Sequence, residues 1–130
     1  MTAPEEGVLV LAPFGRDAEI AASILSKSQI QPRICSTLDD VVSSLNDARC
    51  LVVTEEALIN SDRRAFAAWL GNQPPWSDFP VVLLVMRETE FDRRLAFLDR
   101  YLIVLERPLL ASSLVNSVRS ALRARARQLE

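Results

Sequence analysis

The chain has 130 residues, of which 49% are hydrophobic and 25% are charged, and 15 basic against 17 acidic residues leave a formal net charge of −2. This length suits one domain that can bury enough surface to fold without a metal or a disulfide. The sequence contains no histidine, which excludes His-based zinc sites, Ser-His and Cys-His catalytic pairs and a phosphohistidine relay within the chain. The net charge also excludes a chain-wide field that attracts nucleic acid or membranes.

Five short apolar runs are typical of strands that are covered on both faces of a parallel sheet, because they are continuous and do not alternate with polar residues. They cover residues 8–11, 33–35, 50–53, 81–86 and 102–105. None approaches the roughly 18 apolar residues that a membrane span needs, and the acidic start of the chain is unlike a signal peptide. We therefore expect a five-stranded sheet in a cytoplasmic protein.

Segments with helical spacing separate these runs. We expect helices over residues 17–28, 38–46, 62–70, 90–99 and 110–129. Thr37 is expected to cap the second helix, with Asp40 three residues on, and Ser61 to cap the third, which Gly71 would end. Strict alternation of strands and helices predicts a doubly wound α/β sandwich with its site at the carboxyl ends of the strands.

One long loop covers residues 72–80, where two consecutive prolines exclude a helix. We expect Trp76 in this loop to fold back over the core, and an exposed partner contact is the alternative. Cys35 and Cys50 lie beside apolar runs and lack a CxxC spacing. They are expected to be buried free thiols, as in a reducing compartment.

The repeated strand-helix order, with Arg107-Pro108 directly after the last strand, resembles the receiver domain of bacterial two-component response regulators. The resemblance runs from Val8 to about Ala124 and implies a flavodoxin-like, three-layer (βα)5 sandwich. In that family an acidic pair follows the first strand, a phosphoacceptor aspartate ends the third, a Thr or Ser ends the fourth, and Lys-Pro follows the fifth. The carboxylates hold Mg²⁺, and the ion and the lysine neutralise the transferring phosphoryl group.

The sequence departs from this family pattern at nearly every position. Ala12 and Pro13 stand where the acidic pair is expected, and neither side chain can ligate a metal. Thr54 stands at the phosphoacceptor position, Val85 at the hydroxyl position, and Arg107 replaces the lysine. Phosphate-binding glycine loops are also missing. We therefore predict a chain that binds no metal, uses no cofactor and is not an enzyme.

Arg107 is expected to point back over the strand ends. The Lys-Pro bond of the family is usually cis, and the resemblance implies the same for Pro108. We predict an ion pair between Arg107 and Glu55 or Glu56, which leave the third strand at the same edge; solvated, unpaired side chains are the alternative. A phosphorylated Glu55, or Glu55 as a mimic of phosphoaspartate, is a weaker hypothesis, because Thr54 takes the acceptor position.

A closer resemblance is to the divergent receiver-like segment at the N-terminus of some bacterial sensor histidine kinases. It depends on the sequence segments APFGRD, TEEAL, QPPWSDFPVVLL and VLERPLL. It implies a single receiver-like domain over residues 1–130, with a core over 7–124 and, over 125–130, the start of a helical linker to sensory and kinase domains. A frayed, solvated basic tail is the alternative for the last turns.

The predicted function is a non-catalytic regulatory module of two-component signalling that binds protein partners, including its own following domains and a second copy, without aspartyl phosphorylation. The expected dimer face carries opposite charges on Asp92, Arg93, Arg94, Asp99, Arg100 and Glu106. The alternatives are a phosphorylatable stand-alone response regulator and a nucleic-acid-binding regulator that uses the basic last helix. Nucleic acid is disfavoured as a partner, because the RxRxR spacing of Arg123, Arg125 and Arg127 scatters charge around the helix.

Overall fold

The structure of the chain is a computed structural model that describes residues 5–86, 92–107 and 110–129, without the side chains of residues 99 and 100. The strands are β1 (Glu5–Leu11), β2 (Ile30–Ile34), β3 (Cys50–Thr54), β4 (Val81–Val85) and β5 (Leu102–Glu106). They form one parallel sheet in the order β2-β1-β3-β4-β5. The strand order reverses between β1 and β3, so the carboxyl ends of these strands border the expected site.

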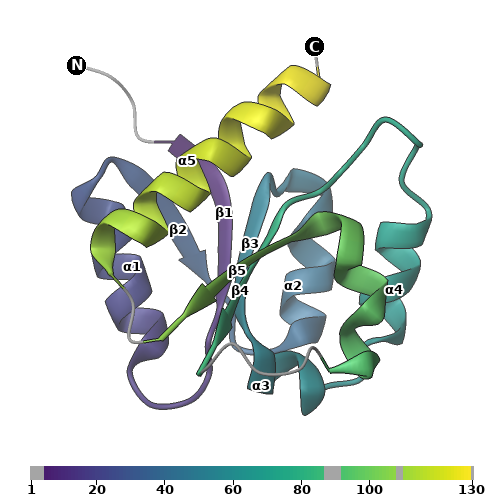
Figure 1. Cartoon of the computed structure of the whole chain (residues 1–130), viewed down its shortest axis with the longest axis horizontal. Coiled ribbons are helices and arrows are strands. Elements are labelled where there is room, and N and C mark those ends of the chain that lie inside the picture. The colour runs from purple at the N-terminus through teal and green to yellow at the C-terminus, as the bar shows by residue number, and fades with distance from the viewer. Residues whose placement is uncertain (1–4, 87–91, 108–109, 130) are drawn as a thin grey trace.

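In the described part of the chain, seven helical segments lie between the strands or follow the last one. They are α1 (Asp17–Lys27), α2 (Leu38–Ser44), the 3-10 turn η1 (Leu45–Asp47), α3 (Glu55–Ile59), α4 (Arg64–Gly71), the 3-10 helix η2 (Arg93–Tyr101) and α5 (Ala111–Gln128). Helices α1 and α5 cover one face of the sheet, and α2, α3, α4 and η2 cover the other (Figure 1). The predicted doubly wound α/β sandwich is confirmed.

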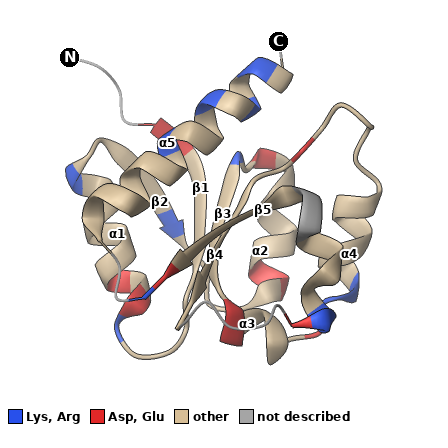
Figure 2. Cartoon of the chain, in the orientation of Figure 1, with Lys and Arg blue, Asp and Glu red and all other residues tan. Residues whose placement is uncertain are grey.

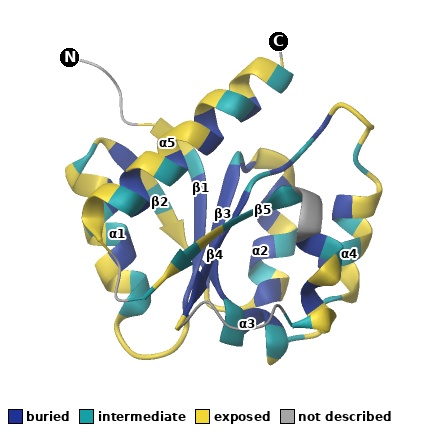
Figure 3. Cartoon of the chain, viewed as in Figure 1, coloured by how far each residue is buried: buried dark blue, intermediate teal, exposed yellow. Residues whose placement is uncertain are grey.

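The central strands are buried on both faces, which explains their uninterrupted apolar sequences. Every residue of β3 and β4 is buried (Figure 3). Each side of the sheet carries its own apolar cluster. The edge strand β2 is largely exposed and contains Pro32. An edge strand tolerates proline because one row of its backbone groups needs no partner.

The helix caps agree with the sequence in part. Thr37 caps α2 as predicted, since its Oγ1 accepts a hydrogen bond from the Asp40 amide at 3.1 Å. The predicted cap at Ser61 is wrong: its Oγ donates to the Ala57 carbonyl at 2.5 Å, and α4 begins only at Arg64. The helix expected over residues 90–99 is a 3-10 helix where the structure describes it, and its first two residues lie outside the described part.

The loop over residues 72–80 buries a different aromatic residue from the expected one. Trp76 is 56% exposed, so the prediction that it folds over the core is wrong. Phe79 is fully buried in its place, with its ring edge-on to Trp69 at a centroid distance of 5.2 Å. The guanidinium of Arg125 lies 5.7 Å from the centre of the same ring. Phe79 therefore joins the loop to both helical layers.

Arg125 fastens the end of α5 to this loop. Its side chain is only 6% exposed, and its Nη1 donates to Ser77 Oγ at 2.6 Å and to Gln128 Oε1 at 2.9 Å. The Asp78 amide donates to the same Gln128 oxygen at 2.8 Å. Burial lowers the pKa of the Arg125 guanidinium, and the negative charge of Asp78 opposes that effect. Arg125 and Gln128 thus bind the loop over residues 72–80.

Both cysteines are buried free thiols, as predicted. Burial raises the pKa of Cys50 to about 12 and also raises the pKa of Cys35, so neither is a reactive thiolate at neutral pH. In the described part of the chain, no helix combines the length and the apolar composition that a bilayer crossing requires.

Candidate functional site

The candidate site lies at the carboxyl ends of β1, β3, β4 and β5, which we call the rim. After β1 the chain passes through buried Ala12 and exposed Pro13 and turns at Gly15, whose φ of +61° favours glycine. This turn starts α1 directly and places Asp17 in its first turn. An acidic side chain therefore reaches the rim from α1, whereas the residues that directly follow β1 carry none.

Thr54 ends β3 and is fully buried. Its Oγ1 accepts a hydrogen bond from the Ala57 amide at 3.3 Å and so caps the first turn of α3. At the position where the receiver family has its phosphoacceptor, this chain therefore uses a buried hydroxyl as a helix cap. Val85, at the end of β4, is buried as well and offers no hydroxyl.

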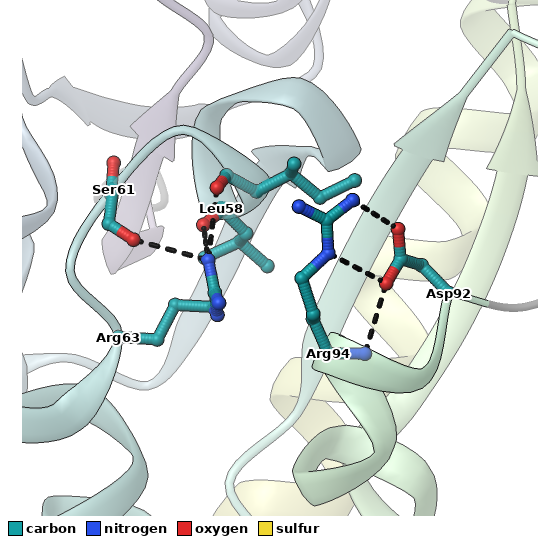
Figure 4. Close-up of polar contacts among 6 residues, drawn as sticks. Leu58, Ser61, Arg63, Asp92 and Arg94 are labelled. Atoms are coloured by element: carbon teal, nitrogen blue, oxygen red, sulfur yellow. Dashed lines mark hydrogen bonds and ion pairs between the residues drawn. The ribbon is translucent and has the colours of Figure 1, made fainter.

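The opposite end of α3 is capped by Arg63 (Figure 4). Its Nη1 donates to the carbonyls of Leu58 and Ile59 at 2.9 Å and to that of Ser61 at 3.1 Å. A helix of five residues has few internal hydrogen bonds, so caps at both ends supply much of its order. These caps fix α3, and with it the position of Glu56.

Arg107 is the centre of the rim. Its backbone amide donates to the Val85 carbonyl at 2.7 Å, which holds it beside the end of β4. Its side chain is 13% exposed, and Nη1 donates to Asp17 Oδ2 at 2.8 Å. Nη2 donates to Glu56 Oε1. One guanidinium thus joins the first turn of α1 to the first turn of α3.

These contacts resolve the alternatives that the sequence left open. Arg107 is paired, and of the two predicted partners the structure places Glu56 against it. The sequence analysis did not predict Asp17 as a partner of Arg107. The feature that could have indicated it is an acidic residue in the first turn of the helix that follows the first strand. Pro108 and its peptide bond lie outside the described residues.

The two neighbouring glutamates differ in their electrostatic setting. Burial and the negative charges of Glu56 and Asp92 raise the pKa of the Glu55 carboxyl, and Arg107 only partly opposes them. Burial acts to lower the pKa of the Arg107 guanidinium, but its hydrogen bonds to Asp17 and Glu56 outweigh that effect and raise it. Glu56 is therefore the glutamate that bonds to Arg107, whereas the surroundings of Glu55 disfavour the charged form of its carboxyl.

Replacing each glutamate with glutamine is expected to have opposite effects on stability at neutral pH. A raised pKa means that the folded chain holds the Glu55 proton more tightly than the unfolded chain, so ionisation costs stability as pH rises through the carboxyl range. Glu55→Gln should therefore stabilise the domain, by roughly 0.5 kcal/mol or less for a group this exposed. Glu56→Gln loses a charge-assisted bond and should cost about 1 kcal/mol.

Urea unfolding of both variants at neutral pH and again below the carboxyl range tests this contrast. The stabilisation by Glu55→Gln should vanish at the lower pH, where Glu55 is protonated in both states. Equal changes in the two variants at neutral pH would contradict the assignment of the two roles.

Two residues of the predicted dimer face, Asp92 and Arg94, bind each other within the domain. Arg94 donates to Asp92 from its backbone amide at 2.9 Å, from Nε at 3.0 Å and from Nη2 at 2.8 Å, which caps η2 (Figure 4). The hydrogen bonds to Arg94 lower the pKa of Asp92 to about 2. Arg93 is exposed on the same helix, and the side chains of Asp99 and Arg100 lie outside the described residues.

No protein-family model matches the chain, and no curated protein matches it. Solved structures do. NtrX from Brucella abortus, in complex with ADP, has a TM-score of 0.72 at 18% identity over 96% of this chain, which spans 28% of the NtrX chain. The CheY-like response regulator receiver domain from Methylobacillus flagellatus has a TM-score of 0.68 at 13% identity, covering 91% of this chain and 98% of that one. The chain has the receiver fold. The beryllofluoride-activated NtrC4 receiver domain dimer agrees, with a TM-score of 0.69 at 16% identity, covering 91% and 97% of the two chains.

The receiver fold implies a Mg²⁺ ion and a phosphoryl group at the rim, and the residues present do not fit them. Ala12 and Pro13 supply no side-chain oxygen, and the Thr54 hydroxyl oxygen caps α3 by accepting the Ala57 amide hydrogen bond. The carboxylates of Asp17 and Glu56, which reach the rim, bind a guanidinium. Among the described residues, no group of three or more His, Cys, Asp or Glu side chains is placed to hold a metal.

Proposed function

We propose that the chain is a receiver-like regulatory module of two-component signalling that acts by binding protein partners and does not undergo aspartyl phosphorylation. One observation carries the proposal: the Arg107 guanidinium lies between Asp17 and Glu56, and a helix-capping threonine ends β3. Phosphoryl transfer depends on a metal and on a positioned nucleophile that this rim does not assemble. Binding is the remaining activity that a domain of this kind performs.

A permanent cation at the rim has a different effect from a phosphoryl group that comes and goes. A switch needs two states of comparable free energy and a ligand that prefers one of them. Arg107 is part of the chain, and its contacts to α1 and α3 are present whenever the domain is folded. We infer that the module presents a constant surface, and that regulation comes from the protein or domain attached to it.

Two kinds of protein partner follow from this proposal. The similarity of several segments to the N-terminal part of sensor histidine kinases supports sensory and kinase domains of the same protein as one partner. A second copy is the other, and it draws support from the dimeric state named for the NtrC4 receiver domain. A cytoplasmic location, where the free thiols of Cys35 and Cys50 stay reduced, is part of this proposal.

Incubation with acetyl phosphate and Mg²⁺, or with beryllofluoride, tests the proposal directly. We expect no change in the intact mass, in the fluorescence of Trp69 and Trp76, or in the oligomeric state measured by light scattering. A receiver domain with a complete acidic site, treated in parallel, should respond in each measurement. A stable phosphoryl adduct on this chain would overturn the proposal and favour a phosphorylatable response regulator.

A further inference from the structure

A groove between α1 and α5 lies apart from the rim contacts. Its volume is about 400 Å³, and its apolar lining includes Ile24 from α1 and Ala111 and Val115 from α5. Two further large apolar side chains, on α1 and directly before α5, are exposed. Ile20 is exposed one turn before Ile24 on α1, and Leu110 is exposed directly before α5. Contiguous exposed apolar patches often mark interaction surfaces.

Among the described residues that line the groove, the charged one is a cation. Lys27 lines it from the last turn of α1. Arg119 closes one side, since its Nη2 donates to the Ser28 carbonyl at 2.7 Å, and Arg123 is exposed one turn farther along α5. The carboxylates of α1 belong to its opposite end, where Asp17 binds Arg107 and Glu19 binds Arg16.

Three arginines of α5 lie on one exposed face of the helix, which we call the stripe, while Arg125 points to another face, as its RxRxR spacing predicts. Arg125 is buried against the loop over residues 72–80, so the exposed arginines are Arg119, Arg123 and Arg127. Residues four apart lie on one face of a helix. The 18 residues of α5 contain no Asp or Glu (Figure 2). This stripe is therefore a one-signed surface beside the groove.

Five arginines elsewhere in the described part of the chain bind carboxylates of the domain. Arg16, Arg33, Arg64, Arg94 and Arg107 each form an ion pair. By contrast, Lys27 and the three arginines of the stripe form no ion pair with another described residue. The cations beside the groove are thus available to a partner of negative charge.

We propose that the groove between α1 and α5 binds an acidic amphipathic helix of a partner protein. An amphipathic helix inserts apolar side chains at i, i+3, i+4 and i+7 into a groove, and Ile24, Ala111 and Val115 offer an apolar floor for them. Acidic side chains on the flank of that helix face Lys27, Arg119 and Arg123. A nucleic acid backbone would use the cations but not the apolar floor. The proposal does not depend on the state of the rim, so a phosphorylatable rim would leave it intact.

Two fluorescein-labelled helical peptides with the same leucine face test this proposal, one with glutamates and one with lysines on its polar face. We expect the glutamate peptide to bind the chain saturably in an anisotropy titration and the lysine peptide not to bind. Ile24→Ser and the double variant Lys27→Glu, Arg123→Glu should each weaken binding at least about tenfold. Trp76→Ser and Arg64→Glu, which change exposed residues away from the groove, are the matched controls and should bind as the parent does.

Three results would overturn the proposal. In the first, both peptides bind equally or the groove variants bind as the parent does. In the second, the glutamate peptide fails to bind while labelled single-stranded RNA does, with Arg123→Glu abolishing RNA binding. In the third, no peptide binds and light scattering finds a homodimer that Ile24→Ser dissociates, which makes a second copy the occupant. Circular dichroism of each variant establishes that the fold is retained.

Discussion

Phe79→Ala is expected to lower the free energy of unfolding by about 3–5 kcal/mol. The ring is fully buried where the loop over residues 72–80 enters β4, and it packs edge-on against Trp69. Its removal leaves a cavity that a loop with two consecutive prolines is poorly able to fill. It also removes the aromatic face beside the buried guanidinium of Arg125, which lies 5.7 Å from the ring centre.

Urea unfolding, followed by tryptophan fluorescence and by far-ultraviolet circular dichroism, measures this effect. Phe14→Ala is the matched control, because Phe14 is half exposed in the loop after β1 and its truncation should stay within about 0.5 kcal/mol. Similar losses in the two variants would mean that Phe79 does not anchor the loop.

Arg107→Met is expected to cost about 2 kcal/mol of stability. Methionine keeps much of the arginine volume but leaves the carboxylates of Asp17 and Glu56 close together without a cation. Breaking a fully buried pair by removing one partner costs about 3–5 kcal/mol. We expect less here, because both carboxylates are partly exposed and water screens their repulsion.

A double-mutant cycle separates this repulsion from a simple loss of packing. In a chain that already carries Asp17→Asn and Glu56→Gln, the substitution Arg107→Met should cost much less than in the parent, because no uncompensated carboxylate remains. Arg64→Met serves as the control, since its partner Asp62 and its own side chain are solvent-exposed, and it should leave the unfolding midpoint unchanged. An equal cost of Arg107→Met in both backgrounds would contradict the role of Arg107 as a bridging cation.

The sheet was predictable because its central strands are covered on both faces and must therefore be continuously apolar. Strand β2 shows where this signal weakens. It lies at the edge, includes Gln31, Pro32 and Arg33, and begins at Ile30, three residues before the predicted run. Helix α3 has only five residues, too few for a helical period to be visible in the sequence, and so nothing local predicts that Thr54 caps it.

The rim was predictable only in part. Arg107 and Glu56 both follow strands that end at this edge, so their meeting follows from topology. Asp17 lies 90 residues from Arg107, and its position depends on the backbone turn at Gly15. The burial of Arg125 also has no local signal, because an arginine near a chain end is ordinarily solvated and its partner Ser77 comes from a distant loop.

The attachment of Arg125 also determines how the end of α5 can move. Displacing the last turns of this helix from the sheet breaks the bonds of Arg125 to Ser77 and of Gln128 to Asp78, and it leaves Phe79 with one side uncovered. These losses occur together, because the same short loop supplies all three partners. The loop and the end of α5 therefore behave as one mechanical unit, and a pull or twist applied at Gln128 is carried through Phe79 into the start of β4.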